Sequence, residues 1–261
     1  MQPLTPCHLH DLGLIDYDAA WGLQDRLAGE IARAERAPTL LLLEHPHTYT
    51  FGRSGQAANL LWSESELARR GAAVRWIDRG GDVTYHGPGQ LVGYPLLPLG
   101  FPSPAGSPEG VLREGESRRR VDVIRYIRDL EKVLIIALAN LGLGAGQIKG
   151  LTGVWIQADV FSRCPRCKPE DRQKPAKIAA IGVKVDARGV SRHGFALNVA
   201  PDMTYFDGIV PCGLPGHPVV SLQDLLAPMP TMDDVKQEVT EAFGEVFGYE
   251  MLSLELEQLG K

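Results

Sequence analysis

Two alternating segments joined by a short turn dominate the second half of the sequence. Residues 177–185 and 190–199 each alternate between apolar and small or polar side chains, which is typical of β-strands. The polar residues 186–189 between them end in Gly189, which can supply the positive φ that a tight turn requires. This pattern predicts a β-hairpin and therefore a sheet that is at least partly antiparallel.

The remaining elements follow one another without a regular strand–helix alternation. Further strands are expected at residues 39–43, 49–51, 73–77, 90–97 and 153–160, and helices at 63–70 and 118–141. A first helix can begin at Asp16 or Asp18, and a last one at Thr231 that ends at Gly248. The order predicts a mixed sheet flanked by helices, of the α+β or mixed α/β class.

Composition excludes several classes of function. The 261 residues carry a net charge of −5 and a pI of about 5.8, which disfavours general nucleic-acid binding. The longest apolar run, residues 133–139, is too short to span a bilayer, and no secretory signal is evident. Four cysteines in a chain of this length do not form a disulfide framework. We therefore expect a cytoplasmic protein that binds neither membrane nor nucleic acid.

The segment 79–90 is the densest in glycine and polar side chains. Its four glycines let the backbone approach a ligand closely, and Arg79, Thr84, Tyr85 and His86 add polar contacts. The segment lacks the Lys-Ser/Thr ending of a Walker loop, and no helical pattern follows it as in a dinucleotide-binding fingerprint. A ligand-binding segment is favoured over a plain turn between strands, because a plain turn does not need so many different polar groups.

The predicted hairpin carries small residues at Ala180, Gly182, Gly194 and Ala196. They leave space over the sheet, either for an apolar groove that takes an acyl chain or for a closely packed helix. Local sequence does not separate these two alternatives.

Two residues suggest nucleophilic chemistry. Cys212 stands alone in a turn rich in glycine and proline, and Lys177 begins the predicted hairpin. A lone cysteine is more often a small buried apolar residue than a nucleophile. A cation beside it, however, lowers the thiol pKa and activates it. If the fold brings Lys177 to Cys212, the chain has a cysteine suited to acyl transfer through a thioester.

A Cys-x-x-Cys motif, Cys164 and Cys167, precedes Lys177. It is half of a structural zinc site, and Cys7, His8 or His10 are the only candidates we see to complete it. A redox pair is a further alternative. The favoured interpretation is a reduced loop with no metal.

Together, residues 79–90, 177–182, 193–198 and 211–213 resemble the motifs of the lipoyl(octanoyl) transferase (LipB) family, in the family's order. That family belongs to the biotin and lipoate protein ligase superfamily, and the resemblance extends from about residue 12 to 246. It implies a single domain over residues 1–261 with the class II synthetase-like mixed sheet of that superfamily. Residues 101–117 and 161–176 depart from the pattern and are interpreted as loop insertions.

The resemblance also implies a function and a site. The octanoyl group of octanoyl-acyl carrier protein would pass to Cys212 and then to a lysine of lipoyl domains, in 2-oxoacid dehydrogenases and the glycine cleavage H protein. Lys177 would lower the pKa of the Cys212 thiol, act as a proton shuttle, or both, with His86 and His193 as alternative bases. No cofactor or metal is implied, and we expect a monomer. The residues that match the family's substrate site are Arg79, Gly80, Gly81, Asp82, Val83, Thr84, Tyr85, His86, Ala180, Ile181, Gly182, Gly194, Phe195 and Ala196.

Two alternatives remain open. An ATP-dependent lipoate or biotin ligase on the same scaffold would have no use for Cys212, and a non-catalytic carrier-binding module would keep Cys212 as a structural residue. An acidic acyl carrier would need a basic docking patch on this acidic chain. Residues 118–120 and 69–70, all arginines, are the predicted patch.

Overall fold

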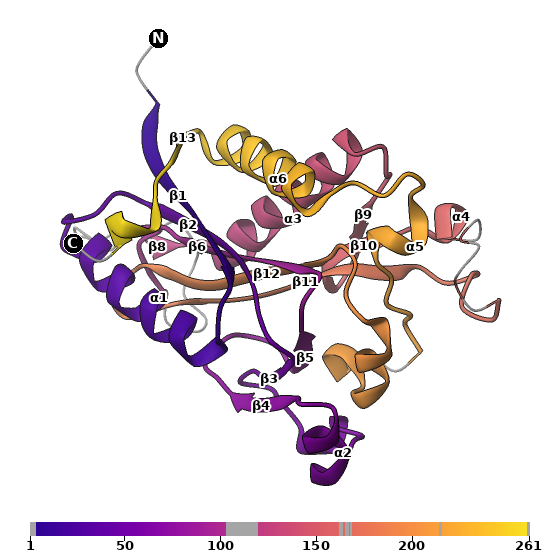
Figure 1. Ribbon diagram of the computed structural model, residues 1–261. Helices are drawn as coiled ribbons and strands as arrows, with labels where there is room; N and C mark the ends of the chain where they lie inside the picture. The colour runs from indigo at the N-terminus through magenta and orange to yellow at the C-terminus, as the bar shows by residue number, and fades with distance from the viewer. Residues whose placement is uncertain are drawn as a thin grey trace.

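The computed structural model describes residues 4–102, 120–161, 164, 167, 169–213 and 216–259, with the backbone alone at 101, 102, 120 and 212. Its centre is a mixed sheet in the order β13-β1-β2-β6-β12-β11-β10-β9 (Figure 1). β1 pairs in parallel with β13 and β2, whereas every pair from β2 to β9 is antiparallel. The strands are β1 (Thr5–Leu14), β2 (Thr39–Glu44), β6 (Gln90–Leu96), β9 (Gly146–Ile148), β10 (Leu151–Ile156), β11 (Ala176–Val185), β12 (Ser191–Asn198) and β13 (Tyr249–Ser253).

Two long helices cover one face of this sheet, α3 (Val123–Asn140) and α6 (Met232–Phe247). Asp122 caps α3 through the Arg125 amide, and a capping box of Thr231 and Asp234 begins α6. Their apolar faces share one core with the strands, which includes Leu134, Leu138 and Phe243. The chain reverses after α6 at Gly248, whose φ of 70° is open to glycine at low cost.

The opposite face is divided between a helix and a smaller sheet. α1 (Tyr17–Ala32), capped by Asp16, packs on β6 and β12. The small sheet has the order β4-β3-β5, from Ala73–Trp76, Thr48–Phe51 and Val83–His86, and lies below the main sheet beside α2 (Glu64–Arg69) in Figure 1. Residues of α1, of β5 and of the β11–β12 hairpin line one cavity, and the candidate site lies there.

Short elements complete the described chain. They are β7 (Phe101–Pro102), β8 (Arg120–Val121), α4 (Ala158–Phe161), α5 (Leu222–Leu225) and the 3-10 helices η1 (Ala57–Asn59), η2 (Met203–Gly208), η3 (Pro211–Gly213) and η4 (Leu256–Leu259). Among the described residues, no helix has both the length and the apolar character to cross a membrane.

The predicted fold class is confirmed, and so is the hairpin: β11 pairs with β12 from Ala179 with Leu197 to Val185 with Ser191, around Gly189 at φ 82°. Two predicted boundaries were wrong. The long helix begins at Val123 because Asp122 caps it, and the strand predicted to reach residue 160 ends at Ile156, before α4. The insertion expected at 101–117 lies almost wholly outside the described residues.

Candidate active site

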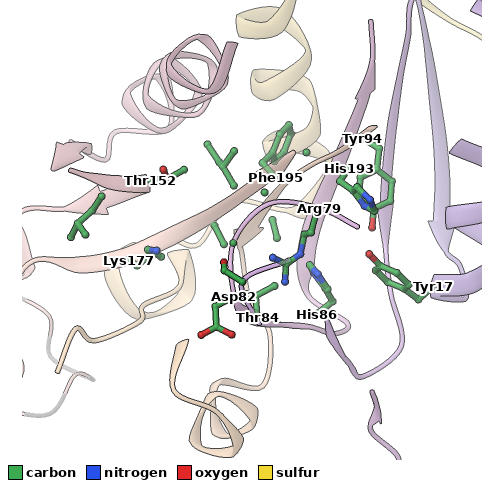
Figure 2. A pocket seen from close by; sticks show the side chains of 18 of the residues that line it. Tyr17, Arg79, Asp82, Thr84, His86, Tyr94, Thr152, Lys177, His193 and Phe195 are labelled. Carbon is green, nitrogen blue, oxygen red and sulfur yellow. The ribbon is translucent and has the colours of Figure 1, made fainter. Parts of the chain in front are cut away.

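A cavity of about 270 Å³ lies over the β11–β12 hairpin (Figure 2). Its floor is made by the small residues of the hairpin, so the space expected over them is open and not filled by a helix. Its walls come from α1, β6, the β9–β10 turn and the loop before β5. The lining residues are Tyr17, Ser54, Arg79, Gly81, Asp82, Thr84, His86, Tyr94, Gly150, Leu151, Thr152, Lys177, Ala180, Ile181, Gly182, His193, Gly194, Phe195 and Ala196.

The loop at residues 79–82 lies directly on β11 because glycine, which has no side chain, stands at the contact. A Cβ at Gly182 would stand 2.9 Å from the Arg79 Cδ and 3.0 Å from the Gly80 carbonyl oxygen. The Gly80 amide donates to the Val183 carbonyl at 3.0 Å, which fixes the loop on the strand. Glycine is therefore needed at 182 for close approach.

Arg79 is buried in the wall of the cavity and is held by the small sheet. Its Nη2 donates to the Thr50 carbonyl at 2.5 Å and to the Thr50 hydroxyl at 2.9 Å, and its Nη1 donates to the Gly80 carbonyl at 2.9 Å. The guanidinium is thus fixed by neutral acceptors before any ligand arrives. Figure 2 shows it between the hairpin and His86.

One end of the cavity is a polar cluster of Tyr17, Tyr94, His45 and His86. His45 bonds the Ile15 carbonyl through Nδ1 at 2.8 Å and the Tyr94 hydroxyl through Nε2 at 2.7 Å. Burial lowers the pKa of His45 to about 4 and that of His86 well below its usual value. Burial also raises the pKa of Tyr17. These groups are neutral at pH 7, so the cluster provides hydrogen bonds without net charge.

His193 contributes an unusual backbone position to the wall. Its φ of 57° is uncommon for a residue with a side chain, and the side chain is 1% exposed. The Nε2 bonds Asp78 at 2.8 Å, whereas Nδ1 has no hydrogen-bond partner among the described residues. Hydrogen bonds from His193 and Lys184 hold the pKa of Asp78 well below its usual range. Burial lowers the pKa of His193 even though Asp78 opposes this. A neutral His193 ring that donates to an ionised Asp78 agrees with the lowered pKa of both groups.

Lys177 lies at the other end of the lining, at the start of β11. Its side chain is 7% exposed, and its Nζ is 4.7 Å from the centre of the Trp155 ring. Gly153 on the neighbouring strand has a φ of 115°, and a Cβ there would be 3.4 Å from the Lys177 Cε. The lysine is therefore packed between neighbours and is not a solvated surface cation.

The segment that follows Cys212 in the chain is hydrogen-bonded to the backbone of this lysine. The Lys177 amide donates to the Pro218 carbonyl at 2.8 Å, and the Val220 amide donates to the Lys177 carbonyl at 3.0 Å. Pro211 and Lys177 both line a second, much smaller cavity of about 10 Å³.

Asp82 lies close to the turn that carries Cys212, next to Gly213. It accepts from the Gln56 amide at 3.0 Å and from the Asn59 side chain, and a Cβ at Gly213 would stand 2.6 Å from its Oδ2. The backbone at Gly213, within η3, therefore lies beside Asp82 of the loop at 79–82.

Twelve of the predicted site residues line the cavity, and three others do not. Val83 and Tyr85 alternate with Thr84 and His86 along β5 and therefore face the core of the small sheet, and Gly80 contacts β11 through its backbone. Six further residues that line the cavity were not predicted from the sequence: Tyr17, Tyr94, Ser54, Gly150, Leu151 and Thr152. Only Tyr94, in a strand that was predicted, could have been found from its alternation.

The Cys-x-x-Cys motif differs from its favoured interpretation. Cys164 and Cys167 form a disulfide with their Cα atoms 5.5 Å apart, so the expected reduced loop was wrong. Cys7 lies elsewhere, buried on β1, where burial raises its pKa to about 12. No group of metal-binding side chains is present among the described residues.

The structure describes part of the predicted docking patch. Arg69 and Arg70 both pair with Glu66 at 2.6 Å, and Arg70 lies over the Trp62 ring. The two arginines share one carboxylate and the Arg69 side chain is 66% exposed, so their role in docking stays a prediction. Arg118 and Arg119 lie outside the described residues, and only the backbone of Arg120 is described.

This fold and this cavity define a class, and comparison with known proteins agrees. Residues 16–244 match the family model of the lipoyl protein ligase A/B catalytic domain. A lipoate protein ligase of an archaeal lipoylation system, from Thermoplasma acidophilum, superposes with a TM-score of 0.67 at 16% identity, over 98% of this chain and 91% of its own. A lipoate-protein ligase A with bound ATP gives 0.65 at 17%, over 97% and 92%. The chain belongs to the lipoyl protein ligase A/B catalytic-domain family.

Within this family the sequence lies with the octanoyltransferases. The octanoyltransferase of Chloroflexus aurantiacus is 44% identical over 96% of both chains. That of Solibacter usitatus is 43% identical over 94% of this chain and 95% of its own. The predicted resemblance to the lipoyl(octanoyl) transferases is thereby confirmed.

Proposed function

We propose that the protein transfers an octanoyl group from octanoyl-acyl carrier protein to a lysine of a lipoyl domain, through a thioester on Cys212. The arrangement of one cavity supports this most directly. Its lining runs from the small residues of the hairpin to Lys177, whose backbone is hydrogen-bonded to the segment that follows Cys212. An acyl chain over the hairpin would therefore present its carbonyl carbon near the cysteine turn.

The reaction has two acyl transfers. The Cys212 thiolate attacks the donor carbonyl, the C–S bond to the carrier breaks, and the carrier thiolate leaves with a proton. The amine of the acceptor lysine then attacks the Cys212 thioester and loses a proton, and an amide forms as the Cys212 thiolate is released. The oxyanion of each step needs N–H donors, and exposed amides of the glycine-rich turns are suited to this role.

Lys177 is assigned the role of cation beside the thiolate. A nearby positive charge lowers the pKa of a cysteine and removes the need for a histidine base. His86 and His193 suit this role of a cation less well, because burial favours the neutral form of both rings. Both ring nitrogens of His86 bond Gln90 and Thr50, and the Nε2 of His193 bonds Asp78. The same lysine can pass protons between the leaving thiol and the incoming amine.

The decisive test is the mass of the protein after mixing with octanoyl-acyl carrier protein. We expect one octanoyl adduct on Cys212 that hydroxylamine removes, and a Cys212→Ala variant that forms no adduct and loses turnover by roughly 10⁴-fold or more. A Lys177→Arg variant keeps the charge but alters its geometry, so it should retain more activity than Lys177→Ala. Near-normal turnover by Cys212→Ala would overturn the proposal.

Replacing octanoyl-acyl carrier protein by free octanoate and ATP distinguishes the proposed transferase from an ATP-dependent ligase. A ligase on the same scaffold would use free octanoate and ATP and would not need Cys212. The proposed reaction uses a thioester donor, whose transfer to an amine is downhill and needs no ATP. We therefore expect no transfer from free octanoate, even with ATP present. Product formed from octanoate and ATP by the Cys212→Ala variant would favour the ligase.

A further inference from the structure

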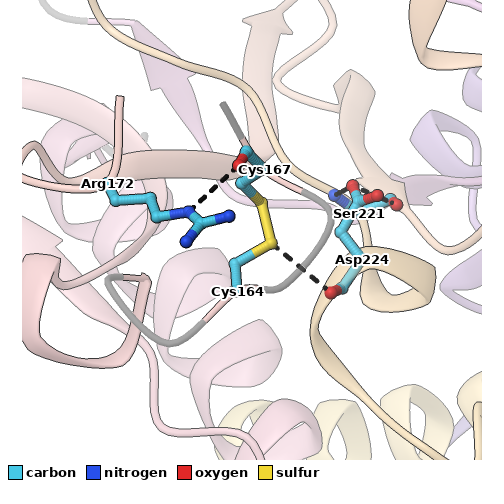
Figure 3. Close-up of a disulfide and its surroundings, with 5 residues drawn as sticks. All are labelled: Cys164, Cys167, Arg172, Ser221 and Asp224. Atoms are coloured by element: carbon cyan, nitrogen blue, oxygen red, sulfur yellow. Dashed lines mark hydrogen bonds between the residues drawn. A yellow bond between two sulfur atoms is a disulfide. The ribbon is translucent and has the colours of Figure 1, made fainter. Parts of the chain in front are cut away.

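The Cys164–Cys167 disulfide lies between Arg172, which precedes β11 in the chain, and the segment of Ser221 and Asp224, which follows Cys212 (Figure 3). The chain continues from Cys167 directly to β11 and Lys177. On the other side, Cys164 contacts the segment that follows Cys212, through the Asp224 carbonyl. The disulfide is therefore placed between the approach to the lysine and the exit from the cysteine turn.

The two sulfur positions differ in access. Cys164 is 1% exposed, whereas Cys167 is half-buried and lines a cavity of about 290 Å³ together with Pro211 and Pro218. Arg172 lies beside the pair and donates to the Cys167 carbonyl at 3.0 Å. A small thiolate can reach Cys167 through this cavity.

Cys164 already has a partner for its reduced form. Its Sγ lies 3.5 Å from the Asp224 carbonyl oxygen, a contact in which a disulfide sulfur has no hydrogen to donate. After reduction the thiol can donate there, so the buried group is satisfied in either state.

Contacts connect this partner to Lys177. The carboxylate of Asp224 accepts from the Ser221 amide at 2.9 Å and its hydroxyl at 2.7 Å, which caps α5. Ser221 directly follows the residues that pair with the Lys177 backbone, around the bridge from Lys177 to Val219. A change in how Cys164 holds Asp224 therefore acts on the strand segment that positions the lysine.

We infer that Cys164 and Cys167 form a thiol–disulfide exchange site for small dithiols, and that its redox state sets the rate at which Cys212 is acylated. This inference rests on the proposed function of Cys212. One thiolate of the dithiol attacks the Cys167 sulfur, and the Cys164 thiolate leaves and takes a proton. The second thiol of the reagent then attacks the mixed disulfide, which releases Cys167 as a thiol. The protein pair gains two electrons and two protons, and the dithiol becomes a cyclic disulfide.

The first experiment measures the exchange itself on the native protein. Alkylation after denaturation should label two of the four cysteines in untreated protein and all four after dithiothreitol treatment without denaturant. A glutathione mixed disulfide trapped on a Cys164→Ser variant should map to Cys167. Four labelled cysteines in untreated protein, zinc bound to the pair, or reduction only in denaturant would each overturn the inference.

The second experiment measures the consequence for acylation. The enzyme is reduced with dithiothreitol, freed of the reagent by desalting because it would cleave thioesters, and mixed with octanoyl-acyl carrier protein. We expect the rate of adduct formation on Cys212 to fall at least threefold while the final adduct stoichiometry is unchanged. Reoxidation should restore the rate.

Matched variants separate the effect of the disulfide from the acylation of Cys212 itself. A Cys164→Ser, Cys167→Ser double variant should show the slow rate and no response to dithiothreitol, with a circular dichroism spectrum like that of the parent. A Cys7→Ala variant should respond like the parent. Equal rates in both redox states would overturn this inference alone, whereas absence of any Cys212 adduct in both states would overturn the proposed function.

Discussion

Two glycines, Gly153 and Gly182, allow close approach of the backbone on β10 and β11 beside the cavity. At Gly153 the backbone conformation and the space both require glycine. Its φ is 115°, and a Cβ would stand 2.6 Å from the Ala179 carbonyl oxygen. The neighbouring Gly182 needs only space, for the loop at Arg79. A side chain at either position would push apart strands or loops that the site needs together.

Replacing Gly153 by alanine should therefore cost both stability and activity. We expect the free energy of unfolding to fall by about 1–3 kcal/mol because of the strained backbone. Acylation of Cys212 should slow because β10 and the Lys177 side chain move. Denaturant unfolding and adduct kinetics measure the two effects.

The control is Gly22→Ala in the exposed part of α1, where a Cβ meets no atom within 4 Å. That change should stabilise the protein by roughly 0.8–1.0 kcal/mol through helix propensity. Equal effects of the two substitutions would contradict the role assigned to Gly153.

Alternation along single strands explains which residues were predicted and which were not. The motif at 79–86 identified the right segment, but a motif match does not distinguish Thr84 and His86 on one side of β5 from Val83 and Tyr85 on the other. Tyr17 reaches the cavity from a distant helix, which only the tertiary fold places there. The disulfide partner of Cys164 likewise depends on loop geometry that spacing alone does not determine.

Among the elements, the strands were predicted well where they form the buried centre. β2, β6, β11 and β12 have continuous apolar or alternating patterns, and all four were expected. β13, at the edge, and β1 beside it were missed because Thr5, His8 and Glu250 interrupt their patterns. β5 was missed because its polar residues face the cavity.

The polar cluster that joins α1, β5 and β6 should make stability depend on pH. His45 is buried with a pKa of about 4, against 6.5 when unfolded, so folding favours its neutral form. This stabilisation is complete above pH 6.5 and is lost as the pH falls through 4. The loss for one such group is on the order of 3 kcal/mol.

A His45→Gln variant tests this, because glutamine keeps one donor and one acceptor but does not titrate. The difference in unfolding free energy between parent and variant should change by that amount between pH 7 and pH 4, measured by urea unfolding. A difference that stays constant over this range would show that His45 does not titrate as described.

For the whole molecule, the charge around the cavity mouth bears on how a carrier would dock. Arg53 and Lys149 are exposed, and each precedes a residue that lines the cavity, Ser54 and Gly150. Opposite charge increases the rate of encounter with an acidic partner and makes that rate sensitive to salt.

Reversal of both charges, Arg53→Glu with Lys149→Glu, should raise KM for octanoyl-acyl carrier protein about three- to tenfold at low salt. KM for a small octanoyl thioester without the carrier should not change. Lys132→Glu, on α3, is the control because α3 contributes no residue to the cavity lining. An equal rise for both donors would indicate damage to the cavity and not lost docking.

The pairing of β13 with β1 has a consequence for the order in which the protein can fold. Thr5 pairs with Tyr249 and Leu9 with Ser253, so the outer edge of β1 is covered by a segment that is made 244 residues later in the chain (249 minus 5). During synthesis β1 can join β2 early, but its other edge waits with unpaired N–H and C=O groups until β13 emerges. The polar residues of β1, which made this strand hard to predict from the sequence, therefore suit an edge that must stay unpaired without aggregating until β13 has been translated.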